Sequence, residues 1–427
     1  MSSEQRCSHS SICYNSSPHA TKVGYKQPSL KQRTLATRPP GSPGPYGHTT
    51  DPTIFPAPLV LPGDDLALDP GYPPQSFREW LVEEDRNNVT SDRKTVYVVA
   101  PPEYDEDAYF AQAWASARVG KSQHQLVAPN SEDIVGYLAA FYHGVPVKLL
   151  RVSDFRFVPW DGQKSKTSPR FIGLAVSDEC IGIRTRACPD QVYPRQLNLD
   201  DLLDVAISIL PKDAYALCLL VNHDLYEDAD DTFVCGRAYG GSRVAVVSSA
   251  RYCPILDEVQ SVEREHSWPA SHCDDYVQKF SSDYVASTKM RKTASESSSL
   301  ATAPLRAALS ALSSLPNINS SPRLLSSLWL SRMCRTASHE LGHCFGIDHC
   351  VYYACIMQGS ASLSEDTRQP PYLCPVDCAK LVYATGSTAR ERYLALLEYC
   401  TKATNRETHF FTAFAAWLTT ALSTVTR

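Results

Sequence analysis

Apolar positions from Thr95 onward alternate between two periodicities. Runs of β-branched and other apolar residues are typical of strands, and they occur at 95–99, 145–151, 171–176, 215–221 and 243–248. Residues 131–142 and 198–210 instead place apolar side chains three or four apart, with Asn198 as the expected N-cap of the second stretch. The run 215–221 is apolar throughout, which is typical of a strand buried on both faces. The alternation predicts an α/β fold with a mixed sheet covered by helices.

The pattern is different at the two ends and in one internal stretch. Residues 1–75 are dense in Pro, Ser and Gly without apolar periodicity, which predicts a disordered N-terminal tail ahead of one domain over 76–427. Residues 274–322 are rich in Ser and Ala, so we expect a mobile insertion with a short helix near 303–312. The apolar run 410–425 is interrupted by threonines and a serine, and it predicts a packed helix, not a membrane span.

Composition narrows the classes of protein. The chain has 427 residues, of which 43% are hydrophobic and 10% aromatic, enough to bury a sizeable core. A net charge of -5 and the lack of a clustered Lys/Arg tract disfavour nucleic acid and anionic membranes as partners. The polar segment Met1 to Ala20 shows no signal peptide, so we expect an intracellular, cytoplasmic protein.

Fifteen cysteines in a reducing compartment favour metal binding over a disulfide framework. In the N-terminal segment, four residues of metal-binding type lie close together in sequence: Cys7, His9, Cys13 and His19. A flexible segment offers no surrounding groups to orient such ligands, so the sequence favours no metal site there.

The segment from His339 to His349 matches the motif HExxHxxGxxH. On a helix, His339 and His343 project from one face about one turn apart, within reach of a single tetrahedral zinc ion. Glu340 lies beside the metal, where it can take a proton from the attacking water and pass it to the leaving amine. The motif therefore predicts a general base next to two zinc ligands.

Gly346 can end the helix and turn the chain so that His349 returns to the ion as the third ligand. Three protein ligands leave a fourth position for water, which is typical of a catalytic site. Two alternatives remain at this point: a structural zinc closed by an Asp or Glu, or histidines that bind no metal.

The residues after the motif carry a resemblance to a known family. They are Cys350-Val351-Tyr352-Tyr353-Ala354-Cys355-Ile356-Met357, followed by Cys374-Pro375-Val376-Asp377-Cys378. With them the chain resembles the archaemetzincin (archaelysin) peptidases of the metzincin clan. The resemblance extends more loosely over residues 76–400, including Asp224-Leu225-Tyr226, Ser249-Ala250-Arg251-Tyr252 and Arg392-Tyr393-Leu394.

The resemblance implies a second, structural zinc bound by Cys350, Cys355, Cys374 and Cys378. Two close pairs of cysteines in an intracellular chain already suggest a Cys₄ site, although each cysteine alone could equally be a small buried hydrophobe. The family's final pair is CxxC, whereas three residues separate Cys374 from Cys378, so Cys378 is the least secure ligand.

The resemblance also makes Met357 the Met-turn residue beneath the catalytic ligands. Cys344 points about 100° away from the metal face of the helix and is interpreted as core. Some metzincins have a Tyr two residues after this Met to stabilise the oxyanion, but that position is Gly359 here. No oxyanion-stabilising residue is assigned.

The sequence thus predicts a metzincin-like α/β fold with two zinc ions, one catalytic and one structural. An N-terminal subdomain over 76–345 would hold the twisted mixed sheet and the zinc helix, and a smaller subdomain over 346–427 would close the metal cleft. The resemblance to metzincins implies that an edge strand, expected at 243–248, pairs with a peptide substrate, which zinc-activated water hydrolyses. The alternative is a non-catalytic, zinc-stabilised interaction scaffold, which would have no chemical need for Glu340.

Overall fold

The computed structural model describes residues 7, 9–39, 50–118, 126–160, 169–280 and 303–424. The chain divides into two compact units. The sheet unit comprises Glu84–Leu256 and Ile318–Gly346, and the helical unit comprises Met1–Glu83, Asp257–Asn317 and Ile347–Arg427. The boundary at Gly346 lies within the histidine motif, and the N-terminal residues group with the C-terminal ones. The subdomain limits expected from the sequence stay predictions.

A five-stranded sheet carries the framework of the sheet unit. Its order is β10-β11-β8-β1-β3, and all neighbours are parallel except the antiparallel pair of β10 and β11. The strands are β1 (Thr95–Val99), β3 (Val147–Leu150), β8 (Ala214–Val221), β10 (Gly236–Tyr239) and β11 (Val244–Ser248). All eight residues of β8 are buried, as its unbroken apolar run predicts.

The prediction that residues 243–248 form an edge strand is wrong. β11 lies between β10 and β8, with Val244 opposite Tyr239 on one side and Leu217 on the other. The edge is β10, a four-residue strand of sequence Gly-Arg-Ala-Tyr. Its short length and mixed polarity give no strand signal, so the sequence assigned the edge to the next strand along the chain.

The structure contains a second, six-stranded sheet, which the sequence analysis did not distinguish from the first. Its order is β2-β4-β5-β6-β7-β9. The strands are β2 (Glu103–Tyr104), β4 (Arg156–Val158), β5 (Phe171–Val176), β6 (Glu179–Ala187), β7 (Arg195–Asn198) and β9 (Asp224–Tyr226), and a 3₁₀ helix, η1 (Glu106–Ala115), follows β2. Only β5 has the continuous apolar run that identifies a strand. The longer β6 mixes charged with apolar residues, most of them exposed or half-buried.

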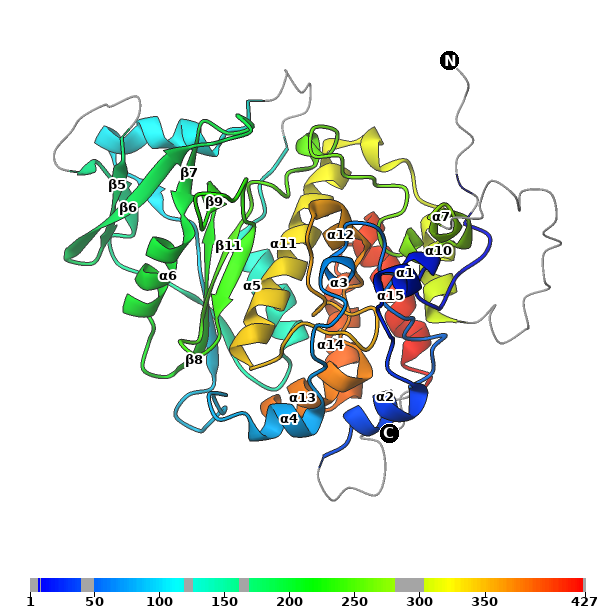
Figure 1. Ribbon diagram of the computed structural model, residues 1–427. Coiled ribbons are helices and arrows are strands. Elements are labelled where there is room, and N and C mark those ends of the chain that lie inside the picture. Colours follow the sequence, from blue (N-terminus) through cyan, green and yellow to red (C-terminus); the bar gives the residue numbers. More distant parts are fainter. Residues whose placement is uncertain are drawn as a thin grey trace, which may run out of the picture. The chain divides into compact units, whose positions relative to one another are not determined.

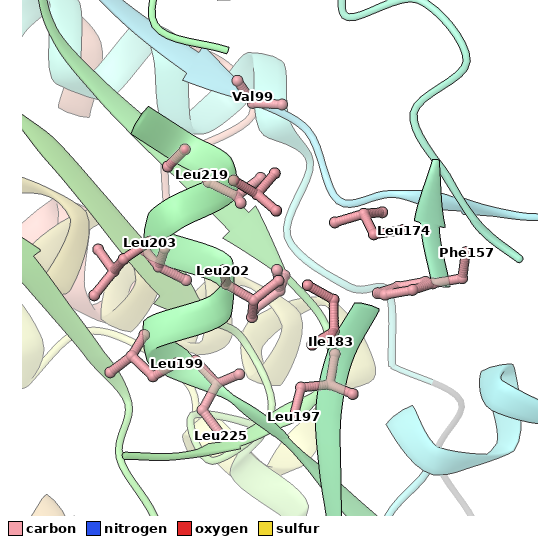
Figure 2. Close-up of a cluster of buried hydrophobic side chains, with 14 of the residues drawn as sticks. Val99, Phe157, Leu174, Ile183, Leu197, Leu199, Leu202, Leu203, Leu219 and Leu225 are labelled. Carbon is pink, nitrogen blue, oxygen red and sulfur yellow. The ribbon is translucent and has the colours of Figure 1, made fainter. Parts of the chain in front are cut away.

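Helix α6 (Leu199–Ser208) joins the two sheets through one hydrophobic cluster. Figure 2 shows its Leu199, Leu202 and Leu203 among side chains from strands of both sheets, including Leu219 of β8 and Ile183 of β6. Burial of each such side chain stabilises the fold by about 1.5–3 kcal/mol. Asn198 caps the helix as predicted, because its side chain accepts a hydrogen bond from the Asp201 N–H.

The opposite side of the five-stranded sheet is covered by α5 (Ser131–Phe141) and α11 (Pro322–Cys344) (Figure 1). α5 packs on β3 and β1, and the long α11 packs on β11, β10 and β8. Ser321 caps α11 by accepting the Leu324 N–H, and Pro322 occupies its first turn. The predicted α/β class, with a mixed sheet and a helix carrying the histidine motif, is confirmed.

The described part of the helical unit contains ten α-helices. They are α1 (Pro18–Val23), α2 (Leu30–Ala36), α3 (Asp65–Leu68), α4 (Phe77–Val82), α7 (Asp274–Gln278), α10 (Pro304–Leu312), α12 (Leu363–Arg368), α13 (Pro375–Thr385), α14 (Ala389–Cys400) and α15 (His409–Ala421). The predicted helices near 303–312 and 410–425 are confirmed as α10 and α15, which pack on each other. No helix among the described residues is both long and apolar enough to cross a bilayer.

The N-terminal residues contain structure where the sequence predicts a disordered tail. Ala20, Tyr25, Val60 and Leu66 are buried in a cluster with Val351. The apolar run 54–61 is interrupted by Pro56 and Pro58, so it shows no helix or strand periodicity, but all of its residues are buried. Residues 40–49 of the predicted tail and 281–302 of the predicted insertion lie outside the described residues.

We predict that His223 makes the free energy of unfolding depend on pH. Its ring is buried against Phe157, its Nε2 lies 3.1 Å from the Ala111 carbonyl oxygen, and burial lowers its pKa from 6.5 to about 4. The unfolded chain therefore binds the proton first as pH falls. Stability is unaffected above pH 6.5 and falls by up to about 3 kcal/mol towards pH 4.

Urea unfolding of the wild type and His223→Gln at several pH values between 7 and 4 would measure this. The Gln variant keeps an N–H donor but does not titrate, so its stability should fall less steeply, by about 1.4 kcal/mol per pH unit in that window. Parallel curves for the two proteins would contradict the prediction.

Candidate metal centre and active site

The last two turns of α11 carry the first half of the histidine motif. His339 and His343 are half-buried, and their Nε2 atoms lie 3.1 Å apart. Two imidazoles bound to one tetrahedral zinc at about 2.0–2.1 Å would place these nitrogens about 3.3 Å apart. The i, i+4 spacing thus gives a pair of nitrogens that fits one zinc ion, as the sequence predicts.

Aromatic side chains of the sheet unit fix this end of α11. The Tyr142 hydroxyl donates to the Ser338 carbonyl at 2.6 Å, and the Tyr215 hydroxyl donates to the Cys344 carbonyl at 3.2 Å. Phe345, the C-cap, stacks on the Tyr142 ring with 5.0 Å between centroids. The Cys344 carbonyl, which the helix end leaves without an intrahelical donor, thereby gains a donor, and the added bond to the Ser338 carbonyl helps to fix the rotation of the last turns.

Glu340 and Cys344 lie on the side of α11 that faces the sheet. Glu340 is largely buried. Burial raises the pKa of the thiols of Cys344 and Cys218, and the nearby Glu340 carboxylate adds to both shifts. Cys344 is fully buried, as predicted for a core residue. Glu340 therefore occupies a position shielded from bulk solvent, one residue from the first histidine.

His349 belongs to the helical unit and is mostly buried there, which lowers its pKa. Its ring lies against that of Tyr72, with centroids 5.8 Å apart. Gly359 adjoins it closely: a Cβ at this position would be 2.9 Å from His349 Nδ1 and 2.1 Å from Asp65 Oδ2. The position where some metzincins carry a Tyr therefore has no room for a side chain in this chain.

Asp65 is a candidate site residue that the sequence analysis missed. Its carboxylate lies near His349 and counteracts the effect of burial on the imidazole pKa. A carboxylate beside one ring nitrogen orients a histidine that binds metal through the other. Asp65 lies in the segment predicted to be disordered, and a single Asp at the start of a four-residue helix gives no sequence signal.

Met357 is fully buried, in keeping with the predicted packing role. Its carbonyl accepts the Cys350 N–H at 2.7 Å and so closes the loop between the two residues. The Met side chain itself offers no hard-metal ligand, so its contribution here is to packing.

Three of the four predicted cysteine ligands come together in the helical unit, joined by a carboxylate. Ligand atoms of Cys350, Cys355, Cys374 and Asp377 all lie within 4.8 Å of one another, and all four residues are buried. Cys350 Sγ is 3.6 Å from Cys374 Sγ, and Asp377 Oδ2 is 3.4 Å from Cys355 Sγ and 3.3 Å from Cys374 Sγ. A tetrahedral zinc at about 2.3 Å from sulfur and 2.0–2.2 Å from oxygen would set these separations near 3.8 and 3.5 Å.

Asp377 stands where the sequence analysis expected Cys378. Cys374 is the N-cap of α13, so the residue three positions later faces it across the first turn, and that residue is Asp377. This is also the position of the second cysteine in a CxxC pair. Cys378, one residue further, is buried beside Arg392 instead.

The Asp377 carboxylate has a buried cationic partner. Lys380 Nζ donates to Asp377 Oδ1 at 3.0 Å and to Gln75 Oε1 at 2.8 Å. The oxygen that faces the sulfurs is the other one, Oδ2. One carboxylate oxygen is thus held by the lysine and the other is directed at the cysteine cluster.

Comparison with known proteins finds a matching family model and several relatives. Residues 316–383 match the family model described as Peptidase family M54. Archaemetzincin-2 of Macaca fascicularis is 25% identical over 348 residues, covering 81% of this chain and 74% of that protein. Archaemetzincin-2 of Rattus norvegicus is 27% identical over 325 residues, covering 74% of this chain and 76% of that protein.

The chain is thus similar to the archaemetzincins, which are zinc metallopeptidases. The resemblance inferred from residues 339–378 is therefore confirmed, and with it the expectation of a zinc metallopeptidase. Among solved structures, the archaemetzincin of Methanopyrus kandleri is 18% identical, with 69% of this chain and 96% of that one covered and a TM-score of 0.33.

Gly240 permits a close backbone approach to the motif helix. It follows β10, and a Cβ at this position would be 2.6 Å from the His343 carbonyl oxygen, whereas a Cβ on Gly241 would meet nothing within 4 Å. We predict that Gly240→Ala lowers the free energy of unfolding by about 1–3 kcal/mol, because backbone must shift to admit the methyl group. Gly241→Ala is the matched control.

Denaturant unfolding of both variants would measure the difference. Gly241→Ala should change stability by less than about 1 kcal/mol. Equal effects of the two substitutions would show that the approach of Gly240 to His343 does not constrain α11.

Proposed function

We propose that this chain cleaves peptide bonds at a zinc ion bound by His339, His343 and His349, with Glu340 as general base. The observation that carries the proposal is the His339–His343 pair, with Nε2 atoms 3.1 Å apart and the buried Glu340 between them in sequence. A histidine pair at zinc spacing beside a shielded carboxylate fits a catalytic zinc site.

His349 is the proposed third ligand. Gly346, at φ 74°, adopts the left-handed conformation that reverses the chain after α11, and only two residues separate it from His349. Asp65 is the proposed positioning residue for His349, since its Oδ2 and His349 Nδ1 both border Gly359 and its charge acts on the imidazole, which would leave Nε2 for the metal. The oxyanion-stabilising residue remains unassigned.

When bound, zinc supplies a Lewis acid that polarises the scissile carbonyl and acidifies the attacking water. Glu340 then accepts the water proton and delivers it to the leaving amine, acting first as base and then as acid. Its burial on the sheet side of α11 keeps the carboxylate in a fixed orientation and out of bulk water. The helix that carries it is fixed at its C-terminal end by Tyr142 and Tyr215.

Strand β10 is the proposed site of substrate pairing. It is the edge of the five-stranded sheet, and the chain following it passes the His343 carbonyl at Gly240. A peptide that adds to an exposed edge gains backbone hydrogen bonds irrespective of its side chains. Pairing there would hold an extended substrate close to the motif helix.

The second zinc is proposed to be structural, with ligands Cys350, Cys355, Cys374 and Asp377. These four protein ligands leave no open position for a reacting water, and all are buried. The ion would connect the loop after the histidine motif to the start of α13. Its loss should therefore destabilise the helical unit, because binding free energy at such a site adds to folding free energy.

We predict that Glu340→Gln retains zinc but loses peptide hydrolysis by at least about 10²- to 10⁴-fold, because the amide cannot accept the water proton. Rates on a mixed peptide library, measured together with the zinc content of each protein, test this. Glu258→Gln, an exposed substitution of the same kind, is the control and should remain fully active.

His343→Ala should behave differently from Glu340→Gln, because it removes a ligand and therefore loses the catalytic zinc as well as the activity. If zinc-loaded wild type cleaves no library peptide faster than Glu340→Gln, the catalytic proposal fails. The non-catalytic scaffold is then the better explanation.

The two neighbours Asp377 and Cys378 allow a direct test of the structural ligand set. We predict that Asp377→Ala lowers the zinc content by one ion per chain and the melting temperature with it, whereas Cys378→Ala keeps the wild-type zinc content. Elemental analysis and thermal unfolding of both variants measure this. Loss of zinc from Cys378→Ala alone would restore the Cys₄ site.

A further inference from the structure

We propose a third metal site in the helical unit, formed by Cys7, His266 and Cys273 and suited to zinc. One ligand atom from each of these residues lies within 4.8 Å of the others. The two sulfur atoms are 3.1 Å apart, although 266 positions separate the cysteines in sequence. Two thiols and an imidazole converging from distant segments form a donor set that borderline-soft cations such as zinc prefer.

His266 provides an observation independent of the cysteines. Its side chain is only 2% exposed, Nδ1 lies 2.6 Å from Glu263 Oε1, and Nε2 has no hydrogen-bond partner among the described residues. Leaving a buried ring nitrogen without a partner costs free energy. A carboxylate on one nitrogen with the other left over is the usual arrangement of a histidine that binds metal.

Backbone contacts hold the N-terminal segment against the loop that carries His266 and Cys273. The Cys7 N–H donates to Glu265 Oε1 at 2.6 Å, and the Cys13 N–H donates to the His272 carbonyl at 2.8 Å. Ile12 forms an antiparallel bridge with Cys273. Cys7 is therefore brought to Cys273 by pairing that does not depend on a metal, which is what a preformed site requires.

His9 is the proposed fourth ligand. Its ring lies edge-on to that of His266 with 5.5 Å between centroids, and its Nε2 also lacks a hydrogen-bond partner within the described part of the chain. The complete site would be Cys₂His₂. Zinc would place the two sulfurs about 3.8 Å apart, so binding requires them to separate by about 0.7 Å.

The alternative for two thiols at this distance is a disulfide. It would require the sulfurs to approach to about 2.05 Å and an oxidant to accept two electrons. A disulfide gives no role to the buried His266 and the Glu263 carboxylate behind it, whereas a metal site uses both. Burial raises the pKa of the Cys273 thiol to about 12, so a bound cation must displace its proton.

The site would attach the N-terminal segment to the loop near 266–273, separately from the catalytic and Cys350–Asp377 sites. Zinc content of the full chain, purified under a phosphine reductant, tests it. We expect Cys7→Ser/Cys273→Ser to hold one zinc fewer than the wild type, and His266→Ala to show the same loss. Cys13→Ser, from the same segment but outside the donor set, should keep the wild-type content.

Alkylation of the wild type gives a second measurement that requires no substitution. Cys7 is half-buried, so it should resist iodoacetamide while zinc is bound and react once a chelator has removed the metal. An unchanged zinc count in the double variant, or equal reactivity of Cys7 with and without zinc, overturns the proposal. A Cys7–Cys273 disulfide in a non-reduced peptide map of the wild type overturns it in favour of a covalent cross-link.

Discussion

The rotational position of one helix turn is the constraint on which the catalytic arrangement depends. His339 and His343 can share an ion only if both imidazoles leave the same face of α11, and Glu340 reaches the reacting atoms only if that face keeps its orientation. The remainder of the sheet unit fixes this orientation. β8 and β11, whose residues are all buried, support α11, and Tyr142 and Tyr215 hold the carbonyls of Ser338 and Cys344 in its final turns. Gly240 allows the chain after β10 to lie against the His343 carbonyl.

The sequence predicted the strands and helices of this framework whose apolar pattern is strong enough to identify them locally. The strands β1, β5, β8 and β11 and the helices α5, α6 and α15 coincide with their predicted ranges to within a few residues, because each has a strong apolar periodicity or run. Strand order could not be obtained in this way. It depends on pairing between segments far apart in sequence, and the four-residue β10 has too little apolar character to reveal that it takes the edge from β11.

The candidate sites also contain some residues that local spacing in the sequence identifies and others that only the folded chain brings together. Histidines and cysteines at motif spacing could be read from the chain because one helix or one tight loop sets their geometry. Asp65 could not, since its role depends on a contact with His349 that the sequence does not record. Asp377 was available in the sequence: it occupies the third position after the N-cap Cys374, where a CxxC pair has its second cysteine. The sequence analysis chose Cys378 as the fourth ligand because it is a cysteine, although Asp377 is the residue that the helical spacing places opposite Cys374.

The N-terminal segment has a larger structural role than its composition suggests. It supplies Asp65 beside His349, Gln75 to the lysine that holds Asp377, and Cys7 to the group with His266 and Cys273. Although it is rich in Pro and Ser, the segment buries apolar side chains, among them Ile54, Phe55, Leu59 and Leu61. Polar contacts to the sites of the helical unit add to this packing. Metal at these sites would therefore stabilise the segment, and the ordering of the segment would in turn fix the carboxylates and thiols that the metals need.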